Sequence, residues 1–458
     1  MNAPKKPRHS HSHETIMRSE GDVNQSEARQ RFVARHLSDE TRQLLDEDAR
    51  YFLHQSLSTP CLNALQSAAG SEMTDLQDRA ILDFHGNSVH QIGHAHPRVC
   101  AAVVEQLQSL AFCPRRFTNH LAVELAKRLS SLAPVRKDGD PPRVLLAPGG
   151  ALAMGMALKL ARYATGRFKT ISMWESFHGA SLDSISIGGE ALFRRDLGPL
   201  LPGCLHVPPY SPSGIGRDSA DYIDYVLEKE GDIAAVIAEP MRWTTVVAPP
   251  ASYWQQIRTS CDKHGALLII DEIPSCLGRT GKMFCIEHFD IEPDMIVVGK
   301  GLGGGIIPLA GLIARGDLNV VAERALGHYT HEKSPLGAAA ALATLDVIAE
   351  EQLLSRTAEL GRRTLQSLSE FSSKNSFARQ ARGLGLQLAL ELDCSGPHGD
   401  QFADRVLYTC MERGLSFKVT EASILTLTPP LTVSDNEMHR ALAIIEGAIV
   451  DCSSTPET

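Results

Sequence analysis

The chain has 458 residues, of which 43% are hydrophobic and 22% charged, a composition typical of a globular protein with one large core and one or two smaller ones. Its formal net charge of −9 leaves no excess of basic residues for nucleic acid or an anionic membrane, and the longest apolar runs are too short to span a bilayer. Ten cysteines without a CxxC pair favour a reducing cytoplasmic location and indicate neither a secreted disulfide framework nor a zinc site.

The N-terminal segment, residues 1–35, is polar, and we expect a mobile tail there because it holds too few apolar groups to form a core. Its alternating histidines, His9-Ser-His-Ser-His13, have the spacing of a metal-binding tract. A solvated segment is the stronger interpretation, so no metal site is predicted. A helix from Asp39 to about Leu57 and a short strand at Leu82–Phe84 follow, and residues 36–100 are assigned to the first part of a small domain.

Helices alternate with short apolar strands between residues 101 and 335, which are predicted to form a large domain. The expected strands are Val144–Ala147, Thr170–Met173, Ala234–Ala238, Ala266–Ile270, Met295–Val298 and Ala310–Ala314. This alternation is typical of an α/β fold with a mostly parallel sheet that helices cover on both faces. Residues 336–458 are assigned to a linking helix, Leu336–Glu350, and to the C-terminal part of the small α+β domain.

Two polar residues follow successive apolar runs of the predicted large domain. Ala266–Ile270 leads into Asp271, and Met295–Val298 leads through Gly299 to Lys300. Such runs predict strands buried on both faces of a parallel sheet, whose carboxyl ends point into the ligand crevice. A carboxylate and an amine there suit pyridoxal phosphate, because lysine forms the Schiff base with the aldehyde and the carboxylate keeps the pyridine nitrogen protonated.

Two other motifs at strand ends each have a functional and a structural interpretation. Pro148-Gly-Gly150 precedes the predicted helix Met154–Arg162, and a helix N-terminus of this kind can bind a phosphate. Glycine before a helix is, however, more often a matter of packing or capping. Phe177 could stack on a pyridine ring, although phenylalanine there is ordinarily core, and His178 fits a site role and a structural role equally well.

The joint order of these features resembles the class III aminotransferase family, which has the fold-type I pyridoxal-phosphate architecture. Three stretches resemble the family's signature: Leu268–Gly281, Glu292-Pro-Asp294 and Gly299–Gly305. The resemblance extends from about Leu82, through Gly93-His-Ala-His-Pro97, to Pro429-Pro-Leu431. It implies a large domain with a mostly parallel sheet, and a small α+β domain built from the N- and C-terminal segments.

The resemblance also implies a role for each matching residue. Lys300 corresponds to the Schiff-base lysine and Asp271 to the partner of the pyridine nitrogen. The other cofactor-binding residues that it implies are Gly150 and Ala151 through backbone N–H groups, Phe177 stacked on the ring, His178, Glu239 and Thr330. Thr330 matches a threonine that reaches the phosphate from the neighbouring subunit, which implies a homodimer with shared active sites.

The sequence departs from the family pattern at three positions. Pro274 replaces a glutamine that hydrogen-bonds the cofactor's ring hydroxyl, and Leu152 replaces an acidic residue of the usual glycine turn. Thr426 replaces an arginine that binds the substrate carboxylate in glutamate-linked members. Without that guanidinium, glutamate or 2-oxoglutarate is held less well, which argues against a glutamate-linked transaminase unless another arginine substitutes.

Further stretches resemble a branch of the family that acts as (R)-1-hydroxy-2-aminoethylphosphonate ammonia-lyase. They are His54–Pro60, Pro114–Thr118, Ala147–Gly150 with Gly155–Arg162, and Asp271–Pro274. This resemblance implies a small-molecule amine substrate, an aminophosphonate, that is converted to phosphonoacetaldehyde and ammonia through a Lys300 aldimine and a quinonoid. The alternative is a transaminase that moves an amino group from a primary amine or amino acid to a keto acid such as pyruvate.

The substrate's phosphonate and its leaving hydroxide each need a partner that the sequence leaves open. Arg115, Arg116 and Arg242 are candidates for binding the phosphonate, although each is more often a surface ion-pair residue. Candidates for the general acid are His178, a hydroxyl group or Lys300 in its protonated form. A non-catalytic cofactor-binding regulator is disfavoured, because the N-terminal tail is too short and polar for a helix-turn-helix.

Overall fold

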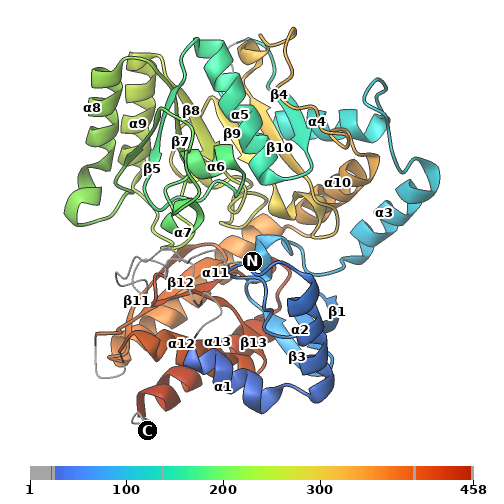
Figure 1. Ribbon diagram of the computed structural model, residues 1–458, viewed down its shortest axis with the longest axis vertical. Helices are drawn as coiled ribbons and strands as arrows, with labels where there is room; N and C mark the ends of the chain where they lie inside the picture. The colour runs from blue at the N-terminus through green and yellow to red at the C-terminus, as the bar shows by residue number, and fades with distance from the viewer. Residues whose placement is uncertain (1–21, 23–25, 137–138, 396–398, 455–458) are drawn as a thin grey trace, which may run out of the picture.

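The computed structural model describes residues 22, 26–136, 139–395 and 399–454 of the chain. The central part of the chain forms the upper half of the molecule in Figure 1, around a large sheet. The N-terminal and C-terminal parts lie together in the lower half. Among the described residues, no helix is both long and apolar enough to cross a bilayer.

The N-terminal part contributes two helices and a small sheet. Its elements are α1 (Glu27–His36), α2 (Asp39–Tyr51), β1 (Leu65–Ala69), β2 (Glu72–Asp75) and β3 (Ala80–Asp83). The sheet has the order β1-β2-β3-β13, and its last strand comes from the far end of the chain. Leu82 pairs with Leu415 of that strand in parallel register, so the two ends of the chain share one sheet.

Seven strands form the central sheet, in the order β4-β10-β9-β8-β7-β5-β6. They are β4 (Arg143–Ala147), β5 (Lys169–Met173), β6 (Cys204–Val207), β7 (Ile233–Ala238), β8 (Leu267–Asp271), β9 (Met295–Val298) and β10 (Ala310–Ala314). Only β10 runs antiparallel to its neighbours. The predicted α/β fold with a mostly parallel sheet is therefore confirmed, and only the edge strand β6 was not expected.

Helices cover both faces of this sheet, as expected from the alternation of elements. They are α4 (His120–Leu132), α5 (Gly150–Thr165), α6 (Leu182–Ile187), α8 (Ser219–Glu230) and α9 (Ala251–His264). Helix α3 (Pro97–Ser109) and the short helix α7 (Ala191–Arg194) complete this part of the chain. Along β8, Ile269 belongs to the apolar cluster that contains α5, whereas Leu268 and Ile270 belong to the cluster that contains α9. Alternate side chains of one strand thus enter opposite layers, which is why the whole run is apolar.

The C-terminal part begins with a helix that packs on α3 and α4 and then builds a second small sheet. Its elements are α10 (Pro335–Glu350), α11 (Leu353–Lys374), β11 (Ala378–Leu384), β12 (Gln387–Leu392), α12 (Phe402–Glu412), β13 (Leu415–Ser416), β14 (Lys418–Thr420), β15 (Ile424–Leu427) and α13 (Asp435–Ser454). The antiparallel order of this sheet is β11-β12-β15-β14. Short 3-10 helices occur at Gly86–Ser88, Gly214–Asp218, Cys285–His288, Lys300–Gly303, Gly316–Leu318 and Gly399–Gln401.

Helix α1 corrects part of the expected N-terminal tail. Ala28 and Phe32, one helical turn apart, are buried in a cluster with Tyr408 of α12, and the Phe32 and Tyr408 rings lie 5.8 Å apart. The prediction of a mobile tail is therefore wrong for residues 27–35, because α12 supplies the rest of the apolar surface that this segment lacks. The stretch His9–His13 lies outside the described residues.

Candidate active site

Three polar residues lie at the carboxyl ends of neighbouring strands in the central sheet. Asp271 is the last residue of β8, Glu239 follows β7, and Lys300 follows β9 after a single glycine. The three strands are parallel and adjacent, with Ala238 of β7 paired to Ile270. The structure therefore brings Asp271, Glu239 and Lys300 together at one edge of the sheet, where ligands bind in folds of this kind.

Asp271 and His178 form a buried pair. His178 Nδ1 lies 2.8 Å from Asp271 Oδ2, and both residues are at most 2% exposed. The other carboxylate oxygen accepts the Ile273 N–H at 3.0 Å. Burial opposes a charge on His178, but the hydrogen bond to Asp271 and the negative charges of Asp271 and Glu239 raise the pKa of His178 above its usual value. The structure therefore gives His178 a definite contact at the site: its ring fixes the orientation of the Asp271 carboxylate.

Lys300 lies beside the loop that follows β7. Its Nζ is 5.3 Å from the ring centroid of Trp243, and the backbone N–H of Trp243 donates to the Glu239 carboxylate at 2.9 Å. Burial raises the pKa of Glu239, while the charge of His178 and the Trp243 N–H act in the opposite direction. Lys300 has a backbone φ of 47°, in the left-handed region that is uncommon for residues other than glycine. The surrounding structure therefore holds this lysine in one particular backbone conformation.

The N-terminus of α5 faces the same region through its glycine turn. Its N-cap is Gly149, which provides no capping side chain, so the backbone N–H groups of the first turn have no side-chain acceptor from that position. A Cβ on Gly150 would lie 2.7 Å from Ile273 Cδ1, close to Asp271. A Cβ on Gly179 would lie 2.6 Å from Ala151 Cβ. Close packing therefore explains why glycine is needed at both positions. The same packing places the first turn of α5 against the loops that carry Asp271 and His178.

Phe177 is 41% exposed, so it is not the core residue that its type suggests. Its ring centroid lies 4.5 Å from that of Phe193 in α7. Together with the buried carboxylate of Asp271, the amine of Lys300 and the uncapped N-terminus of α5, this exposed ring makes a set of groups that fits pyridoxal phosphate. The donors match the phosphate, the carboxylate matches the pyridine nitrogen and the amine matches the aldehyde.

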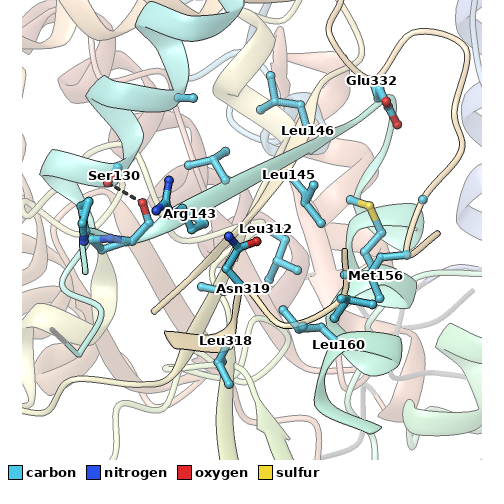
Figure 2. A pocket seen from close by; sticks show the side chains of 18 of the residues that line it. Ser130, Arg143, Leu145, Leu146, Met156, Leu160, Leu312, Leu318, Asn319 and Glu332 are labelled. Carbon is cyan, nitrogen blue, oxygen red and sulfur yellow. Dashed lines mark hydrogen bonds between the residues drawn. The ribbon is translucent and has the colours of Figure 1, made fainter. Parts of the chain in front are cut away.

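Thr330 lies away from these strand ends, in the segment between β10 and α10, where it is exposed. This segment borders a cavity of about 1140 Å³ between α4, α5, β4 and β10. Figure 2 shows its apolar lining from Leu145, Leu312, Met156 and their neighbours. Thr330 itself is not among the residues that line this cavity, whereas Gly327 and Glu332 of the same segment are.

The three candidate arginines have different surroundings. Arg115 lies 2.6 Å from the His328 ring in the segment of Thr330, and Arg116 is exposed. Arg242 follows β7 and joins the two halves of the molecule. Its guanidinium lies 2.8 Å from both the Glu175 and the Glu421 carboxylates. Only Arg242 is therefore near the strand ends, and both of its terminal nitrogens already bind carboxylates.

Trp243 has no motif that would reveal it in the sequence, yet its ring contacts Lys300. Pairing of β13 with β3 brings the two ends of the chain together on the same side of the molecule. The turn between β14 and β15 carries positive φ angles at Glu421 and Ala422, without the glycine that usually marks such a hairpin.

The fold and these groups define a pyridoxal-phosphate-dependent enzyme of fold type I. The chain belongs to the class III aminotransferase family, since the family model described as "Aminotransferase class-III" matches residues 54–449. The resemblance seen in the sequence is thereby confirmed, and so is the cofactor on which the family depends.

Comparisons with individual proteins agree with this membership. The chain is 45% identical to an (R)-1-hydroxy-2-aminoethylphosphonate ammonia-lyase of Vibrio splendidus, over 95% of both chains. It is 34% identical to an acetylornithine aminotransferase of Bacillus subtilis, over 85% of this chain and 96% of that protein. Among solved structures, a transaminase from the marine bacterium Virgibacillus superposes with a TM-score of 0.84 at 26% identity, over 90% of this chain and 99% of that one.

Proposed function

We propose that this enzyme is an ammonia-lyase that converts (R)-1-hydroxy-2-aminoethylphosphonate to phosphonoacetaldehyde and ammonia. The observation that carries the proposal is the 45% identity to the Vibrio splendidus ammonia-lyase, which extends over nearly the full length of both chains. The relatives that are aminotransferases match at 30 to 34% identity. The grouping of Lys300, Asp271 and His178 at one sheet edge supports the chemistry.

The reaction that we propose is redox-neutral. A proton leaves the amine-bearing carbon, hydroxide leaves the neighbouring carbon, and water then replaces the nitrogen to give the aldehyde and ammonia. The water lost in the first stage is regained in the second, so substrate equals product plus ammonia in atoms and electrons. No keto acid takes part, and none is needed to return the enzyme to its starting state.

Each protein group has a defined task in this proposal. Pyridoxal phosphate, when bound, supplies the electron sink for the charge left on the amine-bearing carbon. Lys300 holds the aldehyde carbon and, once the substrate amine has replaced it there, accepts the proton from the amine-bearing carbon. Asp271 keeps the pyridine nitrogen protonated. His178 is a positioning residue, because its contact at 2.8 Å fixes the orientation of the Asp271 carboxylate.

Thr426 supports a substrate without an α-carboxylate. It is 3% exposed, and its hydroxyl donates to the Lys418 carbonyl oxygen at 3.0 Å. A threonine engaged in this way offers no guanidinium fork to a carboxylate. The position that binds a substrate carboxylate in glutamate-linked relatives therefore provides no such binding here, and the engaged Arg242 does not replace it.

The decisive comparison is turnover with and without a keto acid. Purified holoenzyme should release ammonia from the (R)-hydroxy-aminophosphonate at the same rate whether or not pyruvate is present, and no alanine should form. The (S)-enantiomer serves as the matched control substrate. The transaminase alternative, which the similarity to solved transaminases favours, predicts instead that turnover requires pyruvate and yields alanine. That result would refute the lyase.

We also infer a homodimer with shared active sites, in which Thr330 reaches the site of the partner subunit. Its exposed position, and the apolar cavity that Gly327 and Glu332 of the same segment line, support this arrangement. The particle mass in solution should be twice the 49.8 kDa of the chain. Mixing subunits that carry Lys300→Ala with subunits that carry Thr330→Ala should restore activity, because one site of the mixed dimer then has both native residues. A failure to restore activity, with mixed dimers present, would contradict shared sites.

A cytoplasmic location completes the proposal. All ten cysteines are free thiols in the structure, and six of them are buried. Free thiols in this number suit a reducing compartment. Fractionation of cells that produce the protein should place it with the cytoplasmic markers.

A further inference from the structure

The indole ring of Trp243 closes the space on one side of the Lys300 amine. The centre of the ring lies 5.3 Å from Lys300 Nζ, and the tryptophan side chain is half-buried. Two carbon atoms in van der Waals contact lie about 3.5 to 4 Å apart, so a carbon placed between the ring and Nζ would need a gap of roughly 7 to 8 Å. The observed gap therefore has no room for an additional carbon atom.

Hydrogen bonds within the loop fix the backbone that carries this ring. The backbone N–H of Trp243 donates to the Glu239 carboxylate at 2.9 Å. Three residues further on, the Val246 N–H donates to the Arg242 carbonyl at 3.0 Å, and Val246 has a backbone φ of 52°. The loop after β7 is thus a tight turn whose first residues are tied to the end of the strand.

The C-terminal part of the chain holds the same loop from its own side. The Thr420 hydroxyl donates to the Thr244 carbonyl, and the Thr244 hydroxyl donates to the Glu421 carboxylate at 3.2 Å. Arg382 Nε donates to the Thr245 carbonyl at 2.7 Å. Because strands β11 and β14 both contribute to these contacts, the loop cannot move away from the lysine without breaking bonds to the small domain.

The proposed substrate has an unusually small group at the position that this ring restricts. Its amine is attached to a CH2 group, whereas the amine-bearing carbon of an α-amino acid also carries a carboxylate. During the reaction the substrate amine takes the place of Lys300 Nζ on the cofactor aldehyde, so the amine-bearing carbon enters the space beside the ring. Two hydrogens fit there, but a methyl group or a carboxylate in place of one of them would meet the indole.

We propose that Trp243 restricts the enzyme to amines whose amine-bearing carbon is an unsubstituted CH2 group. This inference rests on the proposed ammonia-lyase function, because it assigns the selection of that substrate. Trp243 acts by occupying space, and its indole takes no proton and forms no bond in the reaction. α-Amino acids are then excluded for two reasons, since Thr426 offers no guanidinium to their carboxylate and Trp243 leaves no room for it.

The test compares the binding of two amines that lack the hydroxyl group and so cannot lose hydroxide. 2-Aminoethylphosphonate has a CH2 group beside its amine, and 2-aminopropylphosphonate has a methyl group on that carbon. Dissociation constants follow from the rapid change in cofactor absorbance when each amine is added to holoenzyme without a keto acid. Wild type should bind the better enantiomer of the branched amine about 10- to 100-fold more weakly than the unbranched one, and this ratio should fall to about threefold or less in Trp243→Ala.

A second tryptophan provides the matched control. Trp174 is 47% exposed after β5, where it stacks on His206 with ring centroids 4.6 Å apart, and Trp174→Ala should keep the wild-type ratio. Should Trp243→Ala lose the cofactor, Trp243→Leu takes its place, because leucine keeps an apolar side chain of smaller volume. A wild type that binds both amines equally, or a ratio that stays at its wild-type value when Trp243 is replaced, would overturn the proposal.

Ammonia release from the hydroxy-aminophosphonate separates this inference from the proposed function. Both test amines bind without loss of hydroxide, so their binding ratio does not depend on lyase turnover. Wild type that discriminates between the two amines through Trp243, but releases no ammonia, would refute the lyase and keep the selection. Repeated release of ammonia together with equal binding of the two amines would refute the selection and keep the lyase.

Discussion

The buried pair of His178 and Asp271 makes a prediction whose size and pH dependence both follow from the structure. Replacing His178 by alanine removes a hydrogen bond of 2.8 Å to a carboxylate that is 2% exposed. Hydrogen bonds to charged groups contribute about 1.5 to 3 kcal/mol to stability. At about 2.1 cal/mol/K of unfolding entropy per residue, a chain of 458 residues should lose roughly 2 to 3 °C in its thermal midpoint.

The pH dependence separates this interaction from the cavity that the alanine leaves. The pKa of His178 is raised in the folded protein, so the protonated ring contributes its full stability below the unfolded value of about 6.5. That contribution is lost as pH rises through the folded-state pKa. The difference in thermal midpoint between wild type and His178→Ala should therefore shrink from pH 6.5 to pH 9, whereas the cost of the cavity does not depend on pH.

A histidine with the opposite shift provides the control. Burial and the charge of Arg194 lower the pKa of His206 to about 4, so its ring stays neutral in the folded protein over this pH range. The difference between wild type and His206→Ala should be nearly constant from about pH 6.5 to 9. Differential scanning fluorimetry of the holoenzymes measures both series. A His178→Ala difference that stays constant or grows with pH would refute the assignment of a charged, Asp271-bound ring.

Three further predictions concern the cofactor residues and the N-terminal helix. Lys300→Ala should abolish borohydride-stable attachment of the cofactor and turnover while circular dichroism stays unchanged; lysine-bound cofactor absorbance that persists would contradict its role. Asp271→Ala should keep the attachment but lower kcat by at least about 100-fold, and near-normal turnover would show that the ring nitrogen is held differently. Phe32→Ala should destabilise the packing of α1 on α12 by about 3 to 5 kcal/mol and so release α1. Limited proteolysis would detect this release as faster cleavage before residue 40. Cleavage at the wild-type rate would show that Phe32 does not anchor the helix.

The central sheet could be predicted closely because its strands are buried on both faces. A short apolar run bounded by glycine and polar residues has few possible structures other than a buried strand. The expected bounds of β9 and β10 are those observed. The edge strand β6 was missed since most of Cys204–Val207 is only half-buried and therefore lacks a continuous apolar run. Helix α1 was missed for a related reason: its two buried side chains depend on α12, which lies almost 400 residues away in the chain.

The candidate site likewise has one part that could be predicted from the sequence and one part that could not. Asp271, Glu239 and Lys300 could be placed together from the sequence, because parallel neighbouring strands bring their carboxyl ends to one edge. The engagement of Arg242 by Glu175 and Glu421 could not be foreseen, since it joins three separate loops.

The contact of Trp243 with Lys300 was also out of reach of sequence reasoning. Tertiary contacts of this kind leave no periodic pattern in the chain. The groups that we propose to hold the cofactor follow from local motifs, whereas the residues around them depend on how separate loops meet.

Ammonia released per active site is the most direct test of the central claim. Holoenzyme freed of keto acids should be mixed with excess (R)-1-hydroxy-2-aminoethylphosphonate, and both ammonia and phosphonoacetaldehyde should be counted against cofactor content. The account predicts many equivalents of each product per site, in equal amounts. Release that stops at or below one equivalent per site, with the cofactor left in its aminated form, would contradict a lyase and identify half of a transamination instead.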